Sequence, residues 1–210
     1  MIYDTIIVGG GIGGLQTAIQ LARSLRRVAV VDIPGGRSMI AKGYRNLLGF
    51  PEGISGESLR QLGREQAAKY GAVFVEEEVI SLRSEGDRGF FIYTKSASSP
   101  LHARTLVMAT GIRDPFPDLP GIHECLGVSV FLCPDCDGYE TVGQKVAVIG
   151  ALPQAIGMAD ELAHYTTDIV VVNHEKSPVE DDWRQELQEK AFPFGTSVGG
   201  HEGIPCHSRG

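Results

Sequence analysis

The chain has 210 residues, of which 42% are hydrophobic and 21% charged, and its formal net charge is -7. This composition is typical of a globular protein and argues against a disordered one. The acidic balance argues against a nucleic-acid partner, which would need a basic patch. There is no run of roughly 18 apolar residues that could span a membrane. The first residues lack the basic segment of a secretory signal, so we expect a cytoplasmic protein.

The N-terminal part predicts a strand, a helix and a second strand. Thr5 to Val8 is apolar, partly β-branched and followed by glycines, which is typical of a buried parallel strand. Ile12 to Ser24 carries apolar residues at helical spacing, and Arg27 to Asp32 predicts a second buried strand. A strand–helix–strand unit implies a parallel pair joined by a right-handed crossover.

More elements follow up to a proline-rich stretch. Residues 33–56 are rich in glycine and predict an extended functional loop. A turn at residues 85–89 joins two short strands as a hairpin. The expected helix and strands lie at Glu57–Tyr70, Val73–Val75, Val79–Leu82, Phe90–Thr94 and Arg104–Ala109.

The same order of elements starts again in the second half of the chain. We expect a strand, a turn, a helix, a strand and a helix at Lys145–Ile149, Gly150–Pro153, Gln154–Tyr165, Asp168–Asn173 and Glu180–Lys190. The predicted fold is therefore α/β. A Rossmann-like domain with a parallel sheet and a β-meander covers residues 1–111, and a linker covers 112–121. A partial second nucleotide-binding domain covers 122–190, and a tail covers 191–210.

The glycine-rich turn after the first strand predicts a dinucleotide site. Gly9, Gly11 and Gly14 form a G-x-G-x-x-G pattern between a strand and a helix. The first glycine allows a tight turn, the second lets a pyrophosphate approach, and the third lets helix and strand pack closely. Asp32 ends the next strand, where a carboxylate can accept hydrogen bonds from ribose hydroxyls. The alternative is a glycine-rich turn without a ligand.

A pair of cysteines three residues apart predicts redox chemistry. Cys133 and Cys136 can form a disulfide across one helical turn, and Pro134 suits the first turn of a helix. A thiolate at a helix start is stabilised by backbone N–H groups, which lowers its pKa. The neighbouring Asp137, if partly buried, would have a raised pKa and could donate a proton to a leaving thiolate.

Two other interpretations of this cysteine pair remain open. In the first, the pair belongs to a zinc site with Cys125, Cys206 or His207 as further ligands, although no second C-x-x-C is present. In the second, both cysteines are inert structural thiols, which does not explain the proline between them.

The joint order of these motifs resembles the low-molecular-weight thioredoxin reductase family. The N-terminal glycine loop is followed by Ala109-Thr110-Gly111, by a proline-rich crossover, by Cys133-Pro134-Asp135-Cys136-Asp137-Gly138-Tyr139-Glu140, and by a second strand–glycine–helix unit. The nearest resemblance is to the thioredoxin-reductase-like branch that includes dithiol oxidases. It extends over roughly residues 2–190.

The resemblance implies an FAD domain and an NADPH domain that carries the redox cysteines. It implies that Cys136 lies next to the flavin, that Cys133 attacks the partner and that Asp137 is the acid. Residues that it places at the FAD are Gly9, Gly11, Ile12, Gly14, Asp32, Gly36, Arg37, Asn46, Val79, Thr110 and Gly111.

The sequence departs from the family pattern at three places. The second glycine loop has Leu152 in place of its middle glycine, and we expect this side chain to crowd a pyrophosphate. The paired arginines that bind the 2′-phosphate of NADPH fall at residues 173–176, where Glu175 has the wrong charge. The C-terminal FAD segment of the family is missing, so we expect a truncated form. NADPH as reductant is therefore doubtful, and NADH, another donor or no pyridine nucleotide remain open.

The resulting hypothesis is an FAD-dependent thiol–disulfide oxidoreductase. Its partner would be a thioredoxin-like protein or a small disulfide, or a dithiol if the reaction runs toward oxygen as in the dithiol oxidases. Members of the resembled family are usually homodimers, which we expect here too. The alternative is a non-catalytic remnant that binds flavin or nucleotide without turnover.

Overall fold

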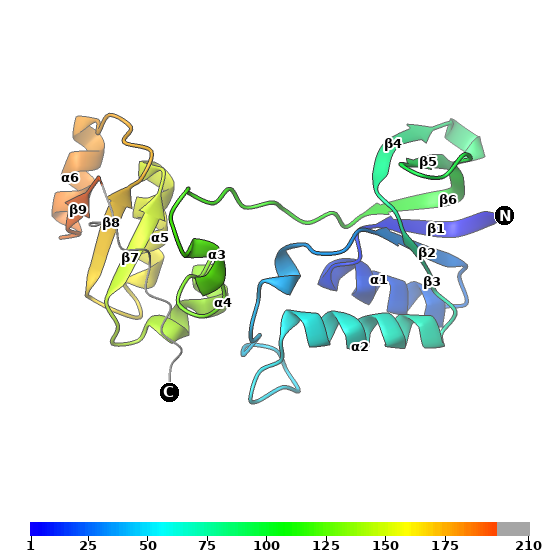
Figure 1. Ribbon diagram of the computed structural model, residues 1–210, viewed down its shortest axis with the longest axis horizontal. Helices are drawn as coiled ribbons and strands as arrows, with labels where there is room; N and C mark the ends of the chain where they lie inside the picture. Colours follow the sequence, from blue (N-terminus) through cyan, green and yellow to red (C-terminus); the bar gives the residue numbers. More distant parts are fainter. Residues whose placement is uncertain (197–210) are drawn as a thin grey trace. The chain divides into compact units, whose positions relative to one another are not determined.

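The computed structural model describes residues 1–196 and has two compact units that divide between Asp114 and Pro115 (Figure 1). This division falls inside the predicted linker. None of the helices within the described residues is long and apolar enough to cross a membrane.

Residues 1–114 form a six-stranded sheet with two α-helices. The strand order is β3-β2-β1-β6-β5-β4; β1 pairs in parallel with β2 and β6, β2 pairs in parallel with β3, and β4-β5-β6 is an antiparallel meander. The elements are β1 (Ile2–Val8), α1 (Ile12–Arg23), β2 (Val28–Asp32), η1 (Arg37–Met39), α2 (Gly56–Lys69), β3 (Val73–Glu76), β4 (Val79–Ser84), η2 (Gly86–Arg88), β5 (Phe90–Thr94) and β6 (Leu101–Met108).

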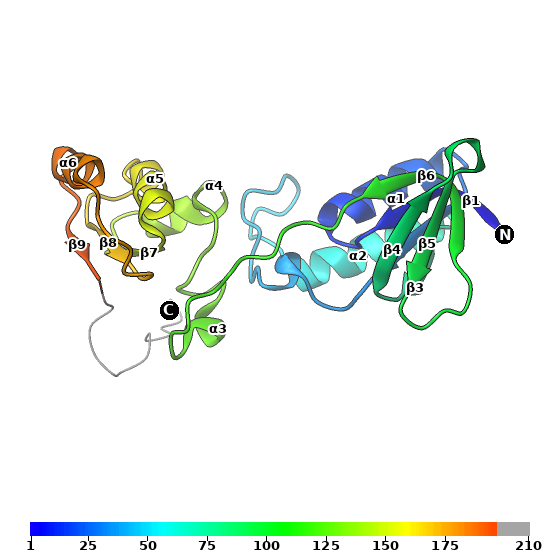
Figure 2. The same cartoon turned by 90° about the horizontal axis from the view of Figure 1, so that it is seen from above.

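The buried strands of this unit pack on both of their faces, as their continuous apolar runs predict. Helices α1 and α2 cover one face of the sheet, where Ile7 and Val30 are buried. The β4–β5 hairpin folds over the other face, where Ile6 and Val31 meet Ile92 (Figure 2). Because successive side chains point to opposite faces, this alternation places both cores around the same central strands.

Residues 115–196 contain a three-stranded parallel sheet in the order β7-β8-β9. Helices α5 and α6 lie side by side over one of its faces (Figure 2) and share a core with it. The elements are α3 (Ile122–Cys125), α4 (Pro134–Asp137), η3 (Gly138–Thr141), β7 (Val146–Gly150), α5 (Leu152–Leu162), β8 (Ile169–Asn173), α6 (Asp181–Glu189) and β9 (Phe194–Gly195).

The α/β fold class and each predicted strand and helix are confirmed, with shifted ends. For example, β1 begins at Ile2 rather than Thr5 because its pairing with β6 extends to Ile2 opposite His102. Within the stretch predicted as a tail, Phe194–Gly195 forms β9 and pairs with β8, a strand that the sequence analysis did not predict. A strand of two residues is too short to show a periodic pattern in the sequence.

Candidate functional site

Predicted site residues meet at one edge of the first unit's sheet. Gly9 follows β1, Asp32 ends β2, and Thr110 lies just beyond β6. These three strands are parallel, so their carboxyl ends share an edge. That edge is where open α/β sheets bind ligands.

At two positions of the loop, the backbone packs so closely that only glycine fits. Gly9 has φ of 106°, and a Cβ there would overlap the carbonyl group of Ala109. A Cβ on Gly14 would overlap the carbonyl oxygen of Gly9. The loop therefore folds back on the segment that leads into Thr110, and the first and third glycines of the pattern hold α1 against it.

The second glycine has the opposite surroundings. No atom lies within 4 Å of a Cβ built on Gly11 or on Gly13, so the start of α1 is open. Gly11 is the N-cap, no side chain caps the helix, and its first turn has no acidic residue. The N–H groups and the positive end of the helix dipole therefore face space that a pyrophosphate can enter. This geometry fits the diphosphate of FAD.

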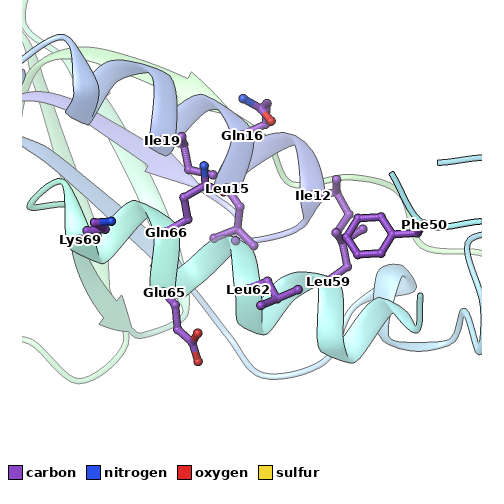
Figure 3. Close-up of a pocket in the computed structure, with 11 residues that line it drawn as sticks. Ile12, Leu15, Gln16, Ile19, Phe50, Leu59, Leu62, Glu65, Gln66 and Lys69 are labelled. Carbon is purple, nitrogen blue, oxygen red and sulfur yellow. The ribbon is translucent and has the colours of Figure 1, made fainter. Parts of the chain in front are cut away.

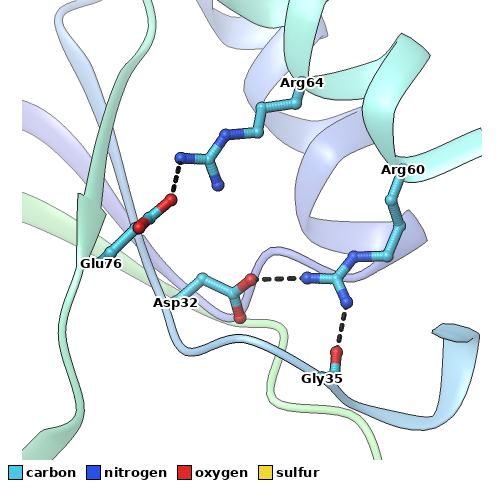
Figure 4. Close-up of polar contacts among 5 residues, drawn as sticks. All are labelled: Asp32, Gly35, Arg60, Arg64 and Glu76. Atoms are coloured by element: carbon cyan, nitrogen blue, oxygen red, sulfur yellow. Dashed lines mark hydrogen bonds and ion pairs between the residues drawn. The ribbon is translucent and has the colours of Figure 1, made fainter. Parts of the chain in front are cut away.

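Asp32 is held by an arginine that the sequence analysis did not identify. Its Oδ2 accepts a hydrogen bond from Arg60 on α2 at 2.7 Å, and the same guanidinium donates to the carbonyl oxygen of Gly35 (Figure 4). Both charged side chains are mostly buried, with exposed fractions of 17% for Asp32 and 14% for Arg60. The carboxylate also lies against Gly10, where a Cβ would come within 2.5 Å of Oδ2.

Two hollows border α2, and one of them lies beside Asp32. It has a volume of about 640 Å³ and is lined by Asp32, Arg60, Gly10 and Gly35 among others. The second hollow, of about 530 Å³, lies between α1 and α2 and is lined by apolar residues such as Ile12 together with polar residues such as Gln66 and Lys69 (Figure 3). Asp32 thus lines the first hollow. Gly10, which lies between the predicted Gly9 and Gly11, and Gly35, which precedes the predicted Gly36, line it too.

The loop after Asp32 is tied to the end of β6. Gly36 has φ of 91°, which favours glycine. Arg37 forms an ion pair with Asp114 at 2.9 Å, so the loop lies close to the segment that follows Thr110 and Gly111. Two other predicted FAD residues do not line the hollow beside Asp32. They are Asn46, which is exposed in the same loop, and Val79, which is half-buried and packs against the core under the hairpin.

The cysteine pair forms a disulfide at the start of α4. The Cα atoms of Cys133 and Cys136 are 5.2 Å apart, and Pro134 takes the first helical position, as predicted. Cys133 is the N-cap, and its Sγ accepts a hydrogen bond from the backbone N–H of Cys136 at 3.2 Å. Such a donor stabilises a thiolate on Cys133 when the disulfide is reduced. Cys136 is exposed and Cys133 is half-buried.

Close packing fixes the segment after the disulfide. Gly138 is buried, and a Cβ there would lie 2.5 Å from Cε2 of Tyr165, just beyond α5. The hydroxyl of Thr141 donates to the carbonyl oxygen of Gly138 at 2.7 Å. The half-buried Asp137 lies between the disulfide and this anchor. Its position next to Cys136 is compatible with the predicted role as an acid.

The described part of the chain contains no set of ligands that would support the zinc interpretation. Across residues 1–196, no group of three or more His, Cys, Asp and Glu side chains could hold a metal ion. Two of the ligands considered above, Cys206 and His207, lie outside the described residues.

The expectation that Leu152 crowds a phosphate is wrong. Leu152 is the first residue of α5, and its side chain is 2% exposed because it points into the core beneath the helix. The predicted position of the 2′-phosphate site lies at the end of β8 and just beyond it. Asn173 is fully buried, and Glu175 is an exposed carboxylate whose charge has the same sign as a phosphate.

The chain is similar to thioredoxin reductases in sequence and in structure. It is 28% identical over 201 residues to a probable thioredoxin reductase of Arthroderma benhamiae, covering 89% of this chain and 50% of that protein. It is 31% identical over 174 residues to a bifunctional thioredoxin reductase/thioredoxin of Mycobacterium leprae, covering 82% and 38%. The crystal structure of HlmI matches with a TM-score of 0.80 and 30% identity, covering 98% of this chain and 70% of that one.

The chain thus spans about half the length, or less, of these two curated relatives. The family model for pyridine nucleotide-disulphide oxidoreductases matches residues 3–198, which is most of the sequence. This match agrees with the glycine loop, the order of the strands and the Cys133–Cys136 disulfide. The chain therefore belongs to the pyridine nucleotide-disulphide oxidoreductase family.

Proposed function

We propose that this chain is an FAD-dependent thiol–disulfide oxidoreductase of the thioredoxin reductase type. The observation that carries the proposal is the Cys133–Cys136 disulfide at the start of α4. Its sulfur at the N-cap accepts a backbone hydrogen bond, which is the arrangement that activates a thiol for exchange.

The proposed exchange uses two sulfur atoms in sequence. With the pair reduced, the Cys133 thiolate attacks one sulfur of a substrate disulfide, which breaks that S–S bond and forms a mixed disulfide. The first substrate thiolate leaves and takes up a proton, which Asp137, next to Cys136, would donate. Cys136 then attacks the Cys133 sulfur and releases the second thiol. The Cys133–Cys136 disulfide forms again, and two electrons have passed to the substrate.

The residues of the first unit supply a cradle for FAD. Gly11 and Gly13 leave the start of α1 open for the pyrophosphate, and Asp32 would accept hydrogen bonds from the ribose hydroxyls. Gly36, Arg37, Thr110 and Gly111 would line the remaining path. When bound, FAD supplies the two-electron chemistry that reduces the disulfide or accepts electrons from the dithiol.

The electron donor is a separate part of the proposal. The family implies a nicotinamide cofactor, but the residues after β8 do not fit the 2′-phosphate of NADPH because Glu175 would repel it. Our proposal therefore does not include NADPH. The corresponding partner is a thioredoxin-like protein or a small disulfide or dithiol, since thioredoxin reductases are among the relatives. A homodimer, as the resemblance implies, and a cytoplasmic location complete the proposal.

Two measurements on the purified chain test this function. The visible spectrum after incubation with FAD and removal of free cofactor is expected to show a bound oxidised flavin. Disulfide exchange with a small aromatic disulfide, after chemical reduction of the pair, is expected in the wild type. Release of both substrate thiols per reduced pair should be lost in Cys133→Ser and Cys136→Ser, because a single cysteine stops at the mixed disulfide, while flavin binding stays unchanged. Release of both thiols by both variants would contradict the assignment. Flavin binding without exchange in the wild type would favour the non-catalytic remnant.

A further inference from the structure

One side chain of α2 joins two parts of the predicted adenosine subsite. The guanidinium of Arg60 bonds the Asp32 carboxylate at 2.7 Å and also donates to the carbonyl oxygen of Gly35 (Figure 4). Asp32 belongs to the end of β2, and Gly35 belongs to the loop that continues to Gly36 and Arg37. Arg60 therefore connects α2 to the strand end and to the following loop at once.

The contact leaves the carboxylate able to bind a ligand. An ionised carboxylate has about four acceptor positions on its two oxygens, and Arg60 bonds only Oδ2. Arg60 is 14% exposed, so its guanidinium forms part of the wall of the 640 Å³ cavity and is not a freely moving surface group. A charge-assisted bond of this kind restricts the rotation of the carboxylate.

We propose that Arg60 is a positioning residue for the adenosine ribose of the cofactor. It holds Asp32 in the orientation in which the remaining acceptor positions face the cavity, and it fixes the loop at Gly35. This inference rests on the proposed binding of FAD. Arg60 acts through Asp32 and through the loop, and it takes no part in the chemistry of the disulfide.

The same helix offers a matched control one turn further on. Arg64 forms an ion pair with Glu76 at 2.6 Å and lies over the ring of Phe74, 4.5 Å from its centroid. Arg64 lines the same cavity, but its guanidinium bonds Glu76 rather than Asp32 or the loop at Gly35. Replacing Arg64 removes an equal charge from the same element and leaves the Asp32 contact intact.

The test is a titration of FAD into the flavin-free 210-residue chain, in which the quenching of flavin fluorescence measures binding. Arg60→Met and Asp32→Asn are each expected to weaken FAD binding by about tenfold, because each removes a bond to a charged group. The double variant is expected to bind about as weakly as Asp32→Asn alone, since Arg60 acts largely through that carboxylate. Arg64→Met should lose much less affinity than Arg60→Met, because Arg64 lines the cavity but does not bond Asp32. Arg60→Lys keeps the charge but not the two-pronged contact, so an intermediate loss is expected.

Several results would overturn the inference. Wild-type or tighter binding by Arg60→Met would mean that Arg60 does not orient Asp32, or that it blocks the site. Losses that add fully in the double variant would mean that the two residues act separately. An equal loss in Arg64→Met would point to a general effect of charge. If Arg60→Met fails to fold, wild-type affinity in Arg60→Lys would overturn the inference instead. A wild-type chain that binds no FAD would reject the proposed function itself, whereas flavin binding unaffected at Arg60 rejects only this role.

Discussion

At the scale of single residues, two neighbouring glycines in the first turn of α1 have opposite surroundings. Gly14 packs so closely that a Cβ would overlap the carbonyl oxygen of Gly9, whereas no atom lies within 4 Å of a Cβ on Gly13. We expect Gly14→Ala to lower the free energy of unfolding by about 1–3 kcal/mol, because the added methyl overpacks a backbone contact. Gly13→Ala should cause no loss, since alanine favours a helix over glycine.

Urea denaturation of the flavin-free protein, followed by circular dichroism, measures both changes. The comparison separates the steric requirement at Gly14 from any effect on the cofactor. Equal stability of Gly14→Ala and the wild type would mean that the loop and α1 can move apart without cost, contrary to the packing observed here.

Residue patterns in the sequence predicted part of the site, and there is a physical reason why they did not predict the rest. The strand end at Asp32 and the glycine turn are local features, so spacing alone placed them together. Arg60 could not be found this way, because its pairing with Asp32 spans 28 positions and depends on how α2 lies beside the sheet. The buried position of Leu152 depends likewise on where the first turn of α5 begins. Asp32 next to an open glycine turn was predictable, and its ionic partner was not.

At the scale of elements, the fold was predictable where apolar patterns are long. Strands β1 and β2 form continuous buried runs, and helix α5 has regular apolar spacing, so each was identified from residue type alone. Short elements carry little pattern. Strand β9 has only two residues and depends on pairing with a part of the chain that lies far away in sequence. Helix α3 has only four residues, which is a single turn. Their positions therefore appeared only in the structure.

The junction of α4 and η3 gives a prediction at this scale. Gly138 presses against the ring of Tyr165 near the end of α5, which anchors the segment that carries the disulfide. Gly138→Ala is expected to lower the free energy of unfolding of residues 115–210 by about 1–3 kcal/mol, because the ring or the backbone has to shift. The matched control is Gly157→Ala within α5, where no atom lies within 4 Å of the added methyl. That variant should be as stable as the wild type or more so.

Thermal unfolding of the oxidised protein distinguishes the two variants. A lower unfolding temperature in Gly138→Ala alone supports the anchor. If both variants unfold like the wild type, Tyr165 moves aside freely, and the glycine after Asp137 is not required by packing.

At the scale of the whole molecule, the two units have separate hydrophobic cores. The first is built around strands β1 and β2, with Ile7 fully buried. The second is built around α5 and β8, with Ile156 only 1% exposed. The chain between them contains several prolines, which suits a linker. A core of its own is what lets a domain fold independently.

We therefore expect scanning calorimetry to resolve two unfolding transitions, because chains with two domains commonly depart from two-state behaviour. Ile7→Ala and Ile156→Ala each remove a buried side chain and should cost about 2–5 kcal/mol within their own unit. Each variant should lower the temperature of one transition by several degrees and leave the other in place. Added FAD should raise only the transition that Ile7→Ala lowers, since the proposed cradle lies within residues 1–114. If a single transition is seen and either variant lowers its temperature, the two units unfold as one cooperative unit, and flavin binding then stabilises the disulfide-bearing segment as well.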